Sequence, residues 1–361
     1  MNCLISRPAA VSSPLPAAIA AWLLASAAVP AAAATTTRVT PLRQDAATAP
    51  QAIRKEAGVM VPMRDGVRLS TDVYFPADAE GPYSTILMRT PYGKDREAPY
   101  RGSIPLFVEA GYAVAFQDTR GRGVSEGEYT VRFSDREDGY DAVSWLVDQT
   151  WSNDQVATFG CSYLGETQIT LAAERHPNHI AAIPMAAAAA YDPGGRPWTS
   201  FDGGVFELAQ TAGWFMSVRA ADRLELYSSL PVVDIVRKSG VVGSDYENFA
   251  SNTPAADYFQ ALDFIRPNDR FDVPALYVDS WYDFGVAETL KLFNQQRENA
   301  ISERARNNQY VIIAPSTHCG WTRGSNNQRS GARDVGDWQM DFDALYLRWY
   351  RFWLDGLDAG I

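Results

Sequence analysis

Residues 156–175 read VATFGCSYLGETQITLAAER. The apolar start predicts a short buried strand, and the stretch from Gly165 to Arg175 predicts a helix. The small residues between them predict a sharp strand-to-helix turn, which would lift the Ser162 hydroxyl above the edge of a sheet. Strand-to-helix turns of this kind usually have the sequence Gly-x-Ser-x-Gly, whereas here the second glycine comes one residue later. A glycine-rich turn with an incidental serine is therefore the alternative.

The rest of the chain alternates between strand-like and helix-like segments. We expect strands at residues 59–63, 67–74, 84–88, 112–116, 156–159, 180–190, 275–279 and 310–313, and helices at residues 136–149, 165–175 and 345–354. Asp65-Gly66 between the first two strands predicts a hairpin. Strands that alternate with helices predict an α/β fold, with a mostly parallel sheet flanked by helices.

Residues 191 to about 268 break this alternation. They are rich in aromatic residues and helix formers, and strand patterns are few. We therefore predict a mainly helical cap, inserted between two strands of the sheet. The α/β domain as a whole would run from residue 58 to residue 361.

A reactive Ser162 would need a neighbouring base, because a serine hydroxyl is a weak nucleophile on its own. The histidines of the chain are His176, His179 and His318. His176 lies beyond Ser162 on the same predicted helix, which at about 1.5 Å per residue places it roughly 20 Å away, and His179 is no nearer. His318 follows the strand at 310–313, at the sheet edge where α/β folds gather their ligands. His318 is the candidate by elimination; a loop histidine without a task is the alternative.

A base of this kind needs a carboxylate that fixes its tautomer. Asp283 follows the strand at 275–279 and is our candidate, whereas the competing Asp279 falls within the strand. Ser162, Asp283 and His318 then follow one another in the order found in α/β-hydrolases. We therefore expect an α/β-hydrolase fold with these three residues at strand ends.

The composition is that of a globular protein, with 46% hydrophobic and 21% charged residues. The net charge is −11 at pH 7. An acidic surface repels phosphate backbones, so we expect no nucleic-acid partner. Three scattered histidines do not form a metal-binding pattern, and we expect neither a metal nor an organic cofactor. The sequence does not predict the oligomeric state.

The N-terminus predicts export. Arg7 is the only charged residue among residues 1–34, and residues 17–29 are almost wholly apolar. An apolar stretch of this length suits the core of a signal peptide and is too short to span a bilayer. We predict a signal peptide at residues 1–34 that is cleaved after Ala34, a polar leader at 35–57, and a periplasmic or secreted protein without a stable membrane span. An uncleaved anchor or a disordered alanine-rich tail is the alternative.

Two cysteines lie beyond the predicted signal peptide, and each adjoins a candidate residue. Cys161 precedes Ser162, and Cys319 follows His318. An even number of cysteines in an oxidising compartment permits a disulfide, provided that the two Cα atoms lie within about 7 Å of each other. Two separate buried thiols are the simpler interpretation, and the sequence leaves both open.

Several short stretches together resemble a known family. They are RTPYGK at residues 89–94, QDTRGRG at 117–123, the turn around Ser162, WYD at 281–283 and PSTH at 315–318. With these stretches the chain is similar, from about residue 58 to its end, to the CocE/NonD hydrolases, which are cocaine-esterase-like and Xaa-Pro-dipeptidyl-peptidase-like. The resemblance implies a serine hydrolase with a triad of Ser162, Asp283 and His318. It also implies an oxyanion hole made by the Tyr92 hydroxyl and the Tyr163 backbone N–H.

The resemblance also carries expectations about domains and substrates. Members usually have a jelly-roll-like domain after the hydrolase domain. This chain stops about where that domain would begin, so we expect a fragment that lacks it. We expect a small-molecule carboxylic ester or amide as substrate, as in the esterase and acylase branches. Phe284, Gly285 and Val286 stand where an amino-acid ester hydrolase would have acidic residues. An Xaa-Pro dipeptidyl-peptidase is the alternative, and a non-catalytic binding protein on a hydrolase scaffold is the second alternative.

Further residues are candidates for supporting roles. The candidates for the substrate pocket are Trp198, Phe201, Phe206, Trp281, Trp214 and Phe215, of which the cap aromatics suit a cap core equally well. Asp202 and Glu207 could bind a substrate amine, or they could simply stabilise the cap. Arg120, in the glycine-rich stretch at 118–123, is expected to pair with a carboxylate in a structural role.

Overall fold

The computed structural model describes residues 53–96, 103–192, 199–216, 220–241, 244–321, 328–338, 340–358 and 360. The predicted signal peptide, its cleavage site and most of the predicted leader lie outside these ranges. Residues 53–57, which we assigned to the leader, instead form the start of strand β1 (Ile53–Pro62), because their backbone pairs with β2 (Arg68–Pro76). None of the described helices is long and apolar enough to cross a membrane.

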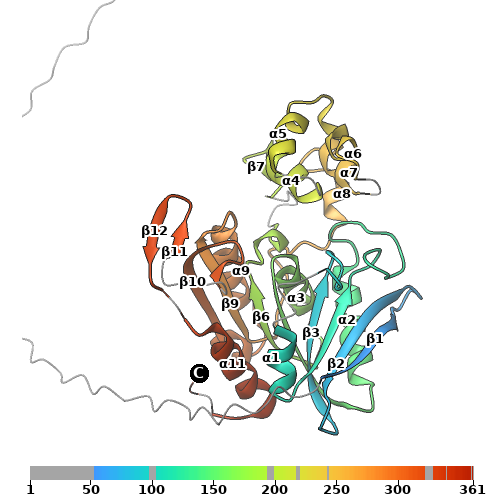
Figure 1. Ribbon diagram of the computed structural model, residues 1–361, viewed down its shortest axis with the longest axis vertical. Helices are drawn as coiled ribbons and strands as arrows, with labels where there is room; N and C mark the ends of the chain where they lie inside the picture. Colours follow the sequence, from blue (N-terminus) through green and yellow to red (C-terminus); the bar gives the residue numbers. More distant parts are fainter. Residues whose placement is uncertain are drawn as a thin grey trace, which may run out of the picture. The chain divides into compact units, whose positions relative to one another are not determined.

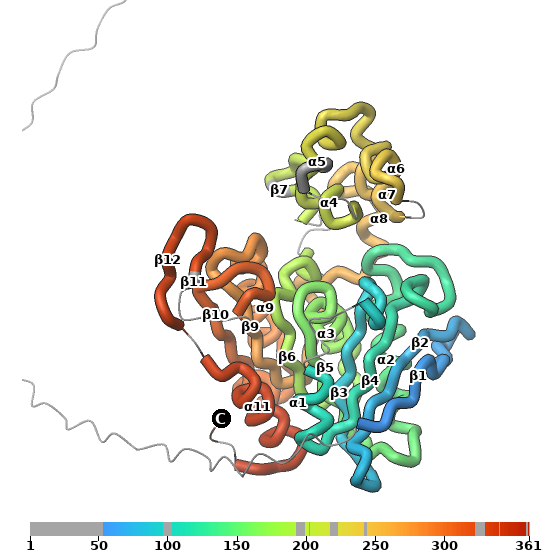
Figure 2. The backbone as a smooth tube through the Cα atoms, viewed as in Figure 1, coloured from blue at the N-terminus to red at the C-terminus, as the bar shows by residue number. Residues whose placement is uncertain are grey.

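The main sheet holds eight of the described strands, in the order β1-β2-β4-β3-β5-β6-β9-β10 (Figure 1; β4 and β5 are labelled in Figure 2). After β1 and β2 come β3 (Tyr83–Thr90), β4 (Ala113–Asp118), β5 (Ser152–Cys161), β6 (His179–Met185), β9 (Ala275–Tyr282) and β10 (Gln309–Thr317). β2 is antiparallel to both β1 and β4, and the remaining neighbours are parallel. The predicted hairpin and the mostly parallel α/β sheet are confirmed.

Helices cover both faces of this sheet. Ile86 and Met88 of β3 pack into one apolar cluster and Leu87 into another, as the alternation of side chains along a strand requires. The first cluster includes residues of α1 (Ser103–Glu109) and α11 (Phe342–Asp355). The other face of the sheet carries α2 (Asp135–Val147), α3 (Tyr163–Glu174) and α9 (Val286–Glu298). The short helix α10 (Glu303–Asn307) precedes β10. Because both faces are covered, β3 and β4 are buried along their whole length, which explains why apolar residues follow one another without alternation at 86–88 and 113–116.

The strands and helices lie close to their predicted positions, and the differences are at the ends. β6 stops at Met185, and a single 3₁₀ turn (Ala188–Ala190) follows where we expected the strand to continue. α11 begins at Phe342, before the predicted start, because the Asp341 carboxylate accepts a hydrogen bond from the Ala344 N–H and caps the helix.

The segment between β6 and β9 is mainly helical in its described part, and Figure 2 traces it. Its elements are β7 (Phe201–Asp202), β8 (Val205–Phe206), α4 (Leu208–Phe215), α5 (Ala220–Tyr227), a 3₁₀ turn (Val232–Asp234), α6 (Ile235–Lys238), α7 (Tyr246–Ser251) and α8 (Asp257–Gln260). It has a small apolar core of its own around Ala212, Ile235 and Tyr246. We did not predict the β7–β8 hairpin or the β11–β12 hairpin (Gln328–Ser330 and Arg333–Gly336), since strands of two to four residues are too short to show a periodic pattern.

Candidate active site

Ser162 lies in the sharp turn between β5 and α3, with φ 63° and ψ −131°. A non-glycine residue with positive φ persists only where its surroundings fix it. Here the Ser162 N–H donates to the Met185 carbonyl at 2.9 Å, and the Ser162 carbonyl accepts from the N–H groups of Gly165 and Glu166 at 2.8 and 3.0 Å. The predicted turn is present, with the strained geometry of a nucleophile elbow.

The two glycines of this turn make room for the helix. A Cβ on Gly160 would collide with the Leu164 side chain, and a Cβ on Gly165 would collide with the Met185 carbonyl. Gly165 therefore lets the first turn of α3 press against the end of β6. In the usual pattern the second glycine lies two residues after the serine. Here the close contact with β6 is made by Gly165, three residues after Ser162, which accounts for the departure seen in the sequence.

His318 and Asp283 lie together at the carboxyl edge of the sheet. β9 ends just before Asp283 and β10 just before His318, and the two strands are parallel neighbours. The His318 Nδ1 and the Asp283 Oδ2 are 2.6 Å apart, and Asp283 Oδ1 accepts the Gly285 N–H at 2.9 Å. The Asp283 side chain is 1% exposed, whereas that of His318 is 32% exposed. A buried carboxylate thus orients an accessible imidazole.

A disulfide joins Cys161 to Cys319, with 6.1 Å between their Cα atoms. The simpler interpretation of two separate thiols is therefore wrong. Each cysteine is the chain neighbour of a candidate residue, so the disulfide holds the Ser162 and His318 segments side by side. Phe284 lines the same pocket as Ser162, and its ring centroid lies 5.0 Å from that of His318.

The other two histidines have partners elsewhere. His176 Nε2 lies 3.0 Å from the Ser144 hydroxyl, and its Nδ1 accepts the Asn178 N–H. His179 Nε2 lies 2.8 Å from the Thr158 hydroxyl, and burial lowers the pKa of His179 to about 3. His179 begins β6, at the end of the strand opposite Met185 and the elbow. Neither histidine is placed to serve Ser162.

Tyr92 and Tyr163 lie beside each other next to the elbow, with ring centroids 6.5 Å apart. The Tyr92 hydroxyl accepts a long hydrogen bond, 3.4 Å, from the Trp214 indole N–H, which leaves its own proton free to be donated. Tyr163 is the first residue of α3, where a backbone N–H has no acceptor within the helix. Both groups suit donors to a developing oxyanion.

The loop that carries Tyr92 is fixed by buried charges. The Lys94 N–H donates to Asp118 Oδ1 at 2.6 Å, and the Lys94 ammonium lies 3.5 Å from Asp118 and 3.6 Å from Asp72. Arg120, two residues after Asp118, pairs with Asp138 and with Asp65, each at 2.6 Å. The expected pairing of Arg120 with a carboxylate is confirmed.

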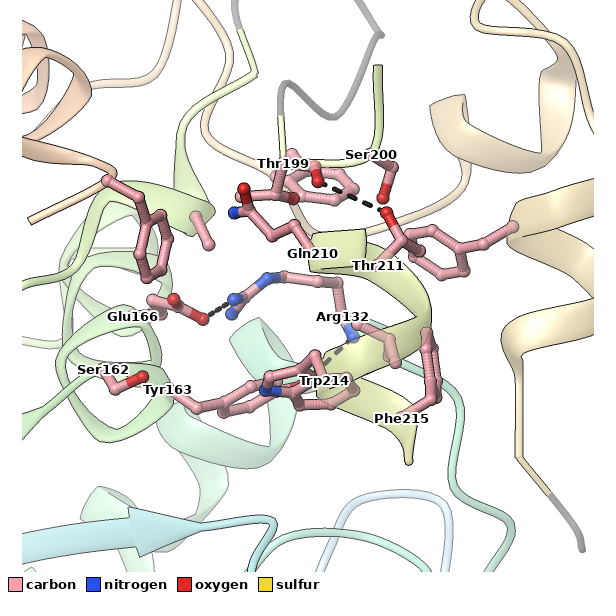
Figure 3. A pocket seen from close by; sticks show the side chains of 15 residues that line it. Arg132, Ser162, Tyr163, Glu166, Thr199, Ser200, Gln210, Thr211, Trp214 and Phe215 are labelled. Carbon is pink, nitrogen blue, oxygen red and sulfur yellow. Dashed lines mark hydrogen bonds and ion pairs between the residues drawn. The ribbon is translucent and has the colours of Figure 1, made fainter. Parts of the chain in front are cut away.

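A pocket of about 210 Å³ opens beside Ser162 and Tyr163 (Figure 3). Its apolar wall comes from Trp214, Phe215, Phe249, Phe264 and Phe284. Its polar part includes an ion pair between Arg132 and Glu166, both almost fully buried. The other polar residues that line it are Ser162, Thr199, Ser200, Gln210 and Thr211. The Arg132 guanidinium also lies 4.3 Å above the Tyr163 ring, and the Tyr163 hydroxyl donates to Asp135 at 2.8 Å.

Part of the predicted pocket is corrected by this geometry. Phe201 is buried in a cluster with Phe259 and packs on Phe206, and neither of these two predicted residues lines the pocket. Trp281 is 61% exposed and also does not line it. Trp198 lies outside the described residues, as does the side chain of Asp202. Glu207 precedes α4 and is not among the lining residues.

Several polar residues at the site were not predicted, and three of them are ionisable. Glu166 lies one helical turn after Ser162, a spacing that could have placed it on the same face of α3. Arg132 lies in a loop and gave no local signal. Asp279 was noted only as a competitor; it is fully buried in β9, and its burial together with the negative charge of Asp283 raises the pKa of Asp279 to about 7. Within the described ranges, no group of three or more His, Cys, Asp or Glu residues could hold a metal ion.

Residues 65–320 match the family model described as X-Pro dipeptidyl-peptidase (S15 family). The chain belongs to this family. Cocaine esterase from Rhodococcus sp. (strain MB1 Bresler) is 31% identical over 303 residues, which cover 76% of this chain and 51% of that protein. The chain therefore spans about half the length of this relative. The resemblance to the CocE/NonD hydrolases is confirmed.

Solved structures share the fold. An aminopeptidase from a marine sediment archaeon (Thaumarchaeota) aligns with a TM-score of 0.65 at 20% identity, covering 88% of this chain and 58% of that one. An α-amino acid ester hydrolase aligns with a TM-score of 0.61 at 21% identity, covering 90% and 58%. A CocE/NonD family hydrolase from Staphylococcus aureus gives 0.58 at 19% identity, covering 85% and 51%. The α/β-hydrolase fold expected from the sequence is confirmed.

Proposed function

We propose that this protein is a serine hydrolase that cleaves carboxylic esters or amides through an acyl-enzyme. The observation that carries the proposal is the hydrogen bond between His318 and the buried Asp283, on a loop that the Cys161–Cys319 disulfide ties to the elbow of Ser162. A base oriented by a carboxylate beside a strained serine is the arrangement that nucleophilic acyl transfer requires.

The proposed reaction uses each of these groups in turn. His318 takes the proton of the Ser162 hydroxyl as its oxygen attacks the substrate carbonyl, and Asp283 stabilises the imidazolium that forms. The Tyr92 hydroxyl and the Tyr163 N–H donate to the oxyanion, where negative charge develops. His318 then protonates the leaving group, and it later removes a proton from the water that releases the acid.

The pocket favours a small apolar acyl group. Its volume is about 210 Å³. Because a cavity of roughly 150 Å³ is enough for one benzene ring, the pocket suits an aromatic ring or a short branched chain. The aromatic walls favour such a group, so we expect short esters of aromatic or branched acids to be hydrolysed fastest.

The Xaa-Pro dipeptidyl-peptidase reading has support in the family model and in one residue. A dipeptidyl-peptidase must bind the ammonium group of a peptide N-terminus, and Glu166 is a carboxylate that lines the pocket. Glu166 is already paired with Arg132, however, which weakens its attraction for a substrate cation. We therefore place this activity second, and comparing p-nitrophenyl esters with Gly-Pro and Ala-Pro anilides would separate the two.

We further propose that the protein is exported and that its signal peptide is removed after Ala34. The apolar segment at 17–29 supports the export, and the disulfide between Cys161 and Cys319 suits an oxidising compartment. N-terminal sequencing of protein from a secreting host should begin at Thr35. A first residue of Met1 on protein recovered only from the host cytoplasm would contradict this proposal.

The decisive test of the chemistry is pre-steady-state hydrolysis of p-nitrophenyl acetate by the wild type and by Ser162→Ala. We expect a burst of about one p-nitrophenol per protein in the wild type and none in the variant. A fluorophosphonate should label the wild type at Ser162. A folded wild type that shows neither burst nor labelling would instead favour a non-catalytic binding protein.

A further inference from the structure

The segments that carry Ser162 and His318 belong to strands that are not neighbours. β6 and β9 lie between β5 and β10 in the sheet. Because adjacent strands are about 4.8 Å apart, β5 and β10 run roughly 14 Å from each other. The loop after β10 must therefore turn back across the ends of β9 and β6 to bring an imidazole to the elbow.

The Cys161–Cys319 disulfide closes this distance. Cys161 is the last residue of β5, and Cys319 follows His318 with a left-handed φ of 52°. Their Cα atoms are 6.1 Å apart, although their strands are more than twice as far from each other. The bond thus connects the residue before the nucleophile directly to the residue after the base.

The other contacts of the loop act in different directions. Asp283 holds the His318 ring, but Asp283 itself sits at the end of β9 and so fixes orientation rather than the distance to Ser162. Trp321 is buried and donates from its indole N–H to the Tyr346 hydroxyl at 3.1 Å, which anchors the loop to α11 on one face of the sheet. Of these three links, the disulfide is the one that joins the loop covalently to the elbow, whereas the Trp321 link reaches the elbow only through Tyr346 and its hydrogen bond to Met185.

We propose that the Cys161–Cys319 disulfide is a positioning element that sets the distance between His318 and Ser162, so that oxidised protein turns over substrate and reduced protein does so poorly. The inference rests on the proposed function. Reduction by a dithiol such as dithiothreitol breaks the S–S bond, transfers two electrons and two protons to give two thiols, and leaves the dithiol as its cyclic disulfide. A displacement of about 1 Å at a reacting group can cost roughly 10²-fold in rate, so a released loop is enough to impair catalysis.

The test compares four preparations of the full chain: oxidised wild type, wild type reduced with dithiothreitol, the double variant Cys161→Ala/Cys319→Ala, and Trp321→Phe. For each, near-ultraviolet circular dichroism and Tm establish that the protein is folded at the assay temperature. We then measure kcat and KM for p-nitrophenyl acetate and the rate of fluorophosphonate labelling. Trp321→Phe is the matched control, because it removes a different anchor of the same loop.

We expect kcat and the labelling rate to fall by about 10- to 100-fold in the reduced and double-variant proteins, with KM nearly unchanged. Both acylation and deacylation use His318 as the base, so both should slow. Trp321→Phe should lower Tm while largely keeping kcat. Reoxidation should restore the activity of the wild type, and dithiothreitol should not alter the double variant. If the disulfide only stabilised the fold, its reduction or removal would lower Tm without changing kcat in the folded protein.

Two results would overturn the inference while leaving the proposed function intact. One is a folded, reduced wild type that keeps the kcat and labelling rate of the oxidised protein. The other is a thiol titration of active, air-oxidised protein that finds Cys161 and Cys319 reduced. An oxidised wild type that gives neither burst nor labelling would overturn the proposed function itself, and so distinguishes the two failures.

Discussion

The carboxyl edge of the sheet and the cap contribute to the same pocket under different constraints. At the sheet edge, Ser162, Asp283 and His318 each follow a strand, and the strand order determines where each can lie. In the cap, the short helices between β6 and β9 must supply both a core and a pocket wall from the same aromatic residues. The positions of the reactive groups therefore depend on backbone topology, whereas the pocket wall depends on which aromatic side chains face the pocket and which are buried in the cap.

The largest effect should come from the sheet edge. Asp283→Asn keeps the size of the side chain but stabilises the wrong tautomer of His318, so we expect kcat for p-nitrophenyl acetate to fall by about 10⁴. Asp341→Asn, at the start of α11, serves as a control and should leave kcat close to that of the wild type. A loss of less than 10-fold in Asp283→Asn would show that Asp283 does not orient the base.

The second-largest effect on kcat is expected at Tyr92, which contacts both Tyr163 at the sheet edge and Trp214 in the cap. Tyr92→Phe removes one proposed oxyanion donor and keeps the ring, so kcat should fall by about 10²- to 10³-fold with little change in KM. Steady-state kinetics measure both constants. Tyr74→Phe, which removes a hydroxyl from β2, is the matched control. An unchanged kcat in Tyr92→Phe would leave the Tyr163 N–H without this partner.

A smaller effect on turnover is expected from the cap, where two aromatic residues should behave differently. Trp214 is 41% exposed and lines the pocket, so Trp214→Ala should change the ratio of kcat/KM for benzoate and acetate esters by about 10-fold. Phe201 is buried in an apolar cluster with Phe259 and does not line the pocket, so Phe201→Ala should leave that ratio unchanged and lower the free energy of unfolding by about 3 kcal/mol. The distinction between wall and core would be lost if both variants moved the ratio equally.

At Asp279 we expect an effect on the stability of the fold and not on turnover. The pKa of Asp279 is about 7 in the folded protein, above its ordinary value of 3.8. Between these two pH values the unfolded chain releases a proton that the folded chain retains, so this group lowers stability as the pH rises through that window. Asp279→Asn resembles the protonated acid and should raise Tm at pH 8 but not near pH 4. Equal changes in Tm at both pH values would contradict the raised pKa.

The sequence predicted the sheet edge well because each clue there is local. The turn around Ser162 needs small residues at fixed offsets, and the few histidines left His318 as the candidate base. The cap was harder, because the face that an aromatic residue presents depends on the packing of several short helices. Phe201 and Phe206 were therefore assigned to the pocket, while Phe249 and Phe264, which line it, were missed. The disulfide could not be predicted from local sequence, because its two cysteines are 158 residues apart in the chain and only the folded structure shows that they are close.

Trp214 is expected to link substrate selectivity to the rate of turnover. Its ring stacks at 15° on that of Tyr163, its N–H reaches the Tyr92 hydroxyl, and its side chain forms part of the pocket wall. Any substitution that reshapes the wall at this position also disturbs the neighbours of both proposed oxyanion donors. Directed evolution toward bulkier substrates should therefore accept changes at Phe249 or Phe264 before changes at Trp214, and natural variants that differ at Trp214 should carry compensating changes around Tyr92.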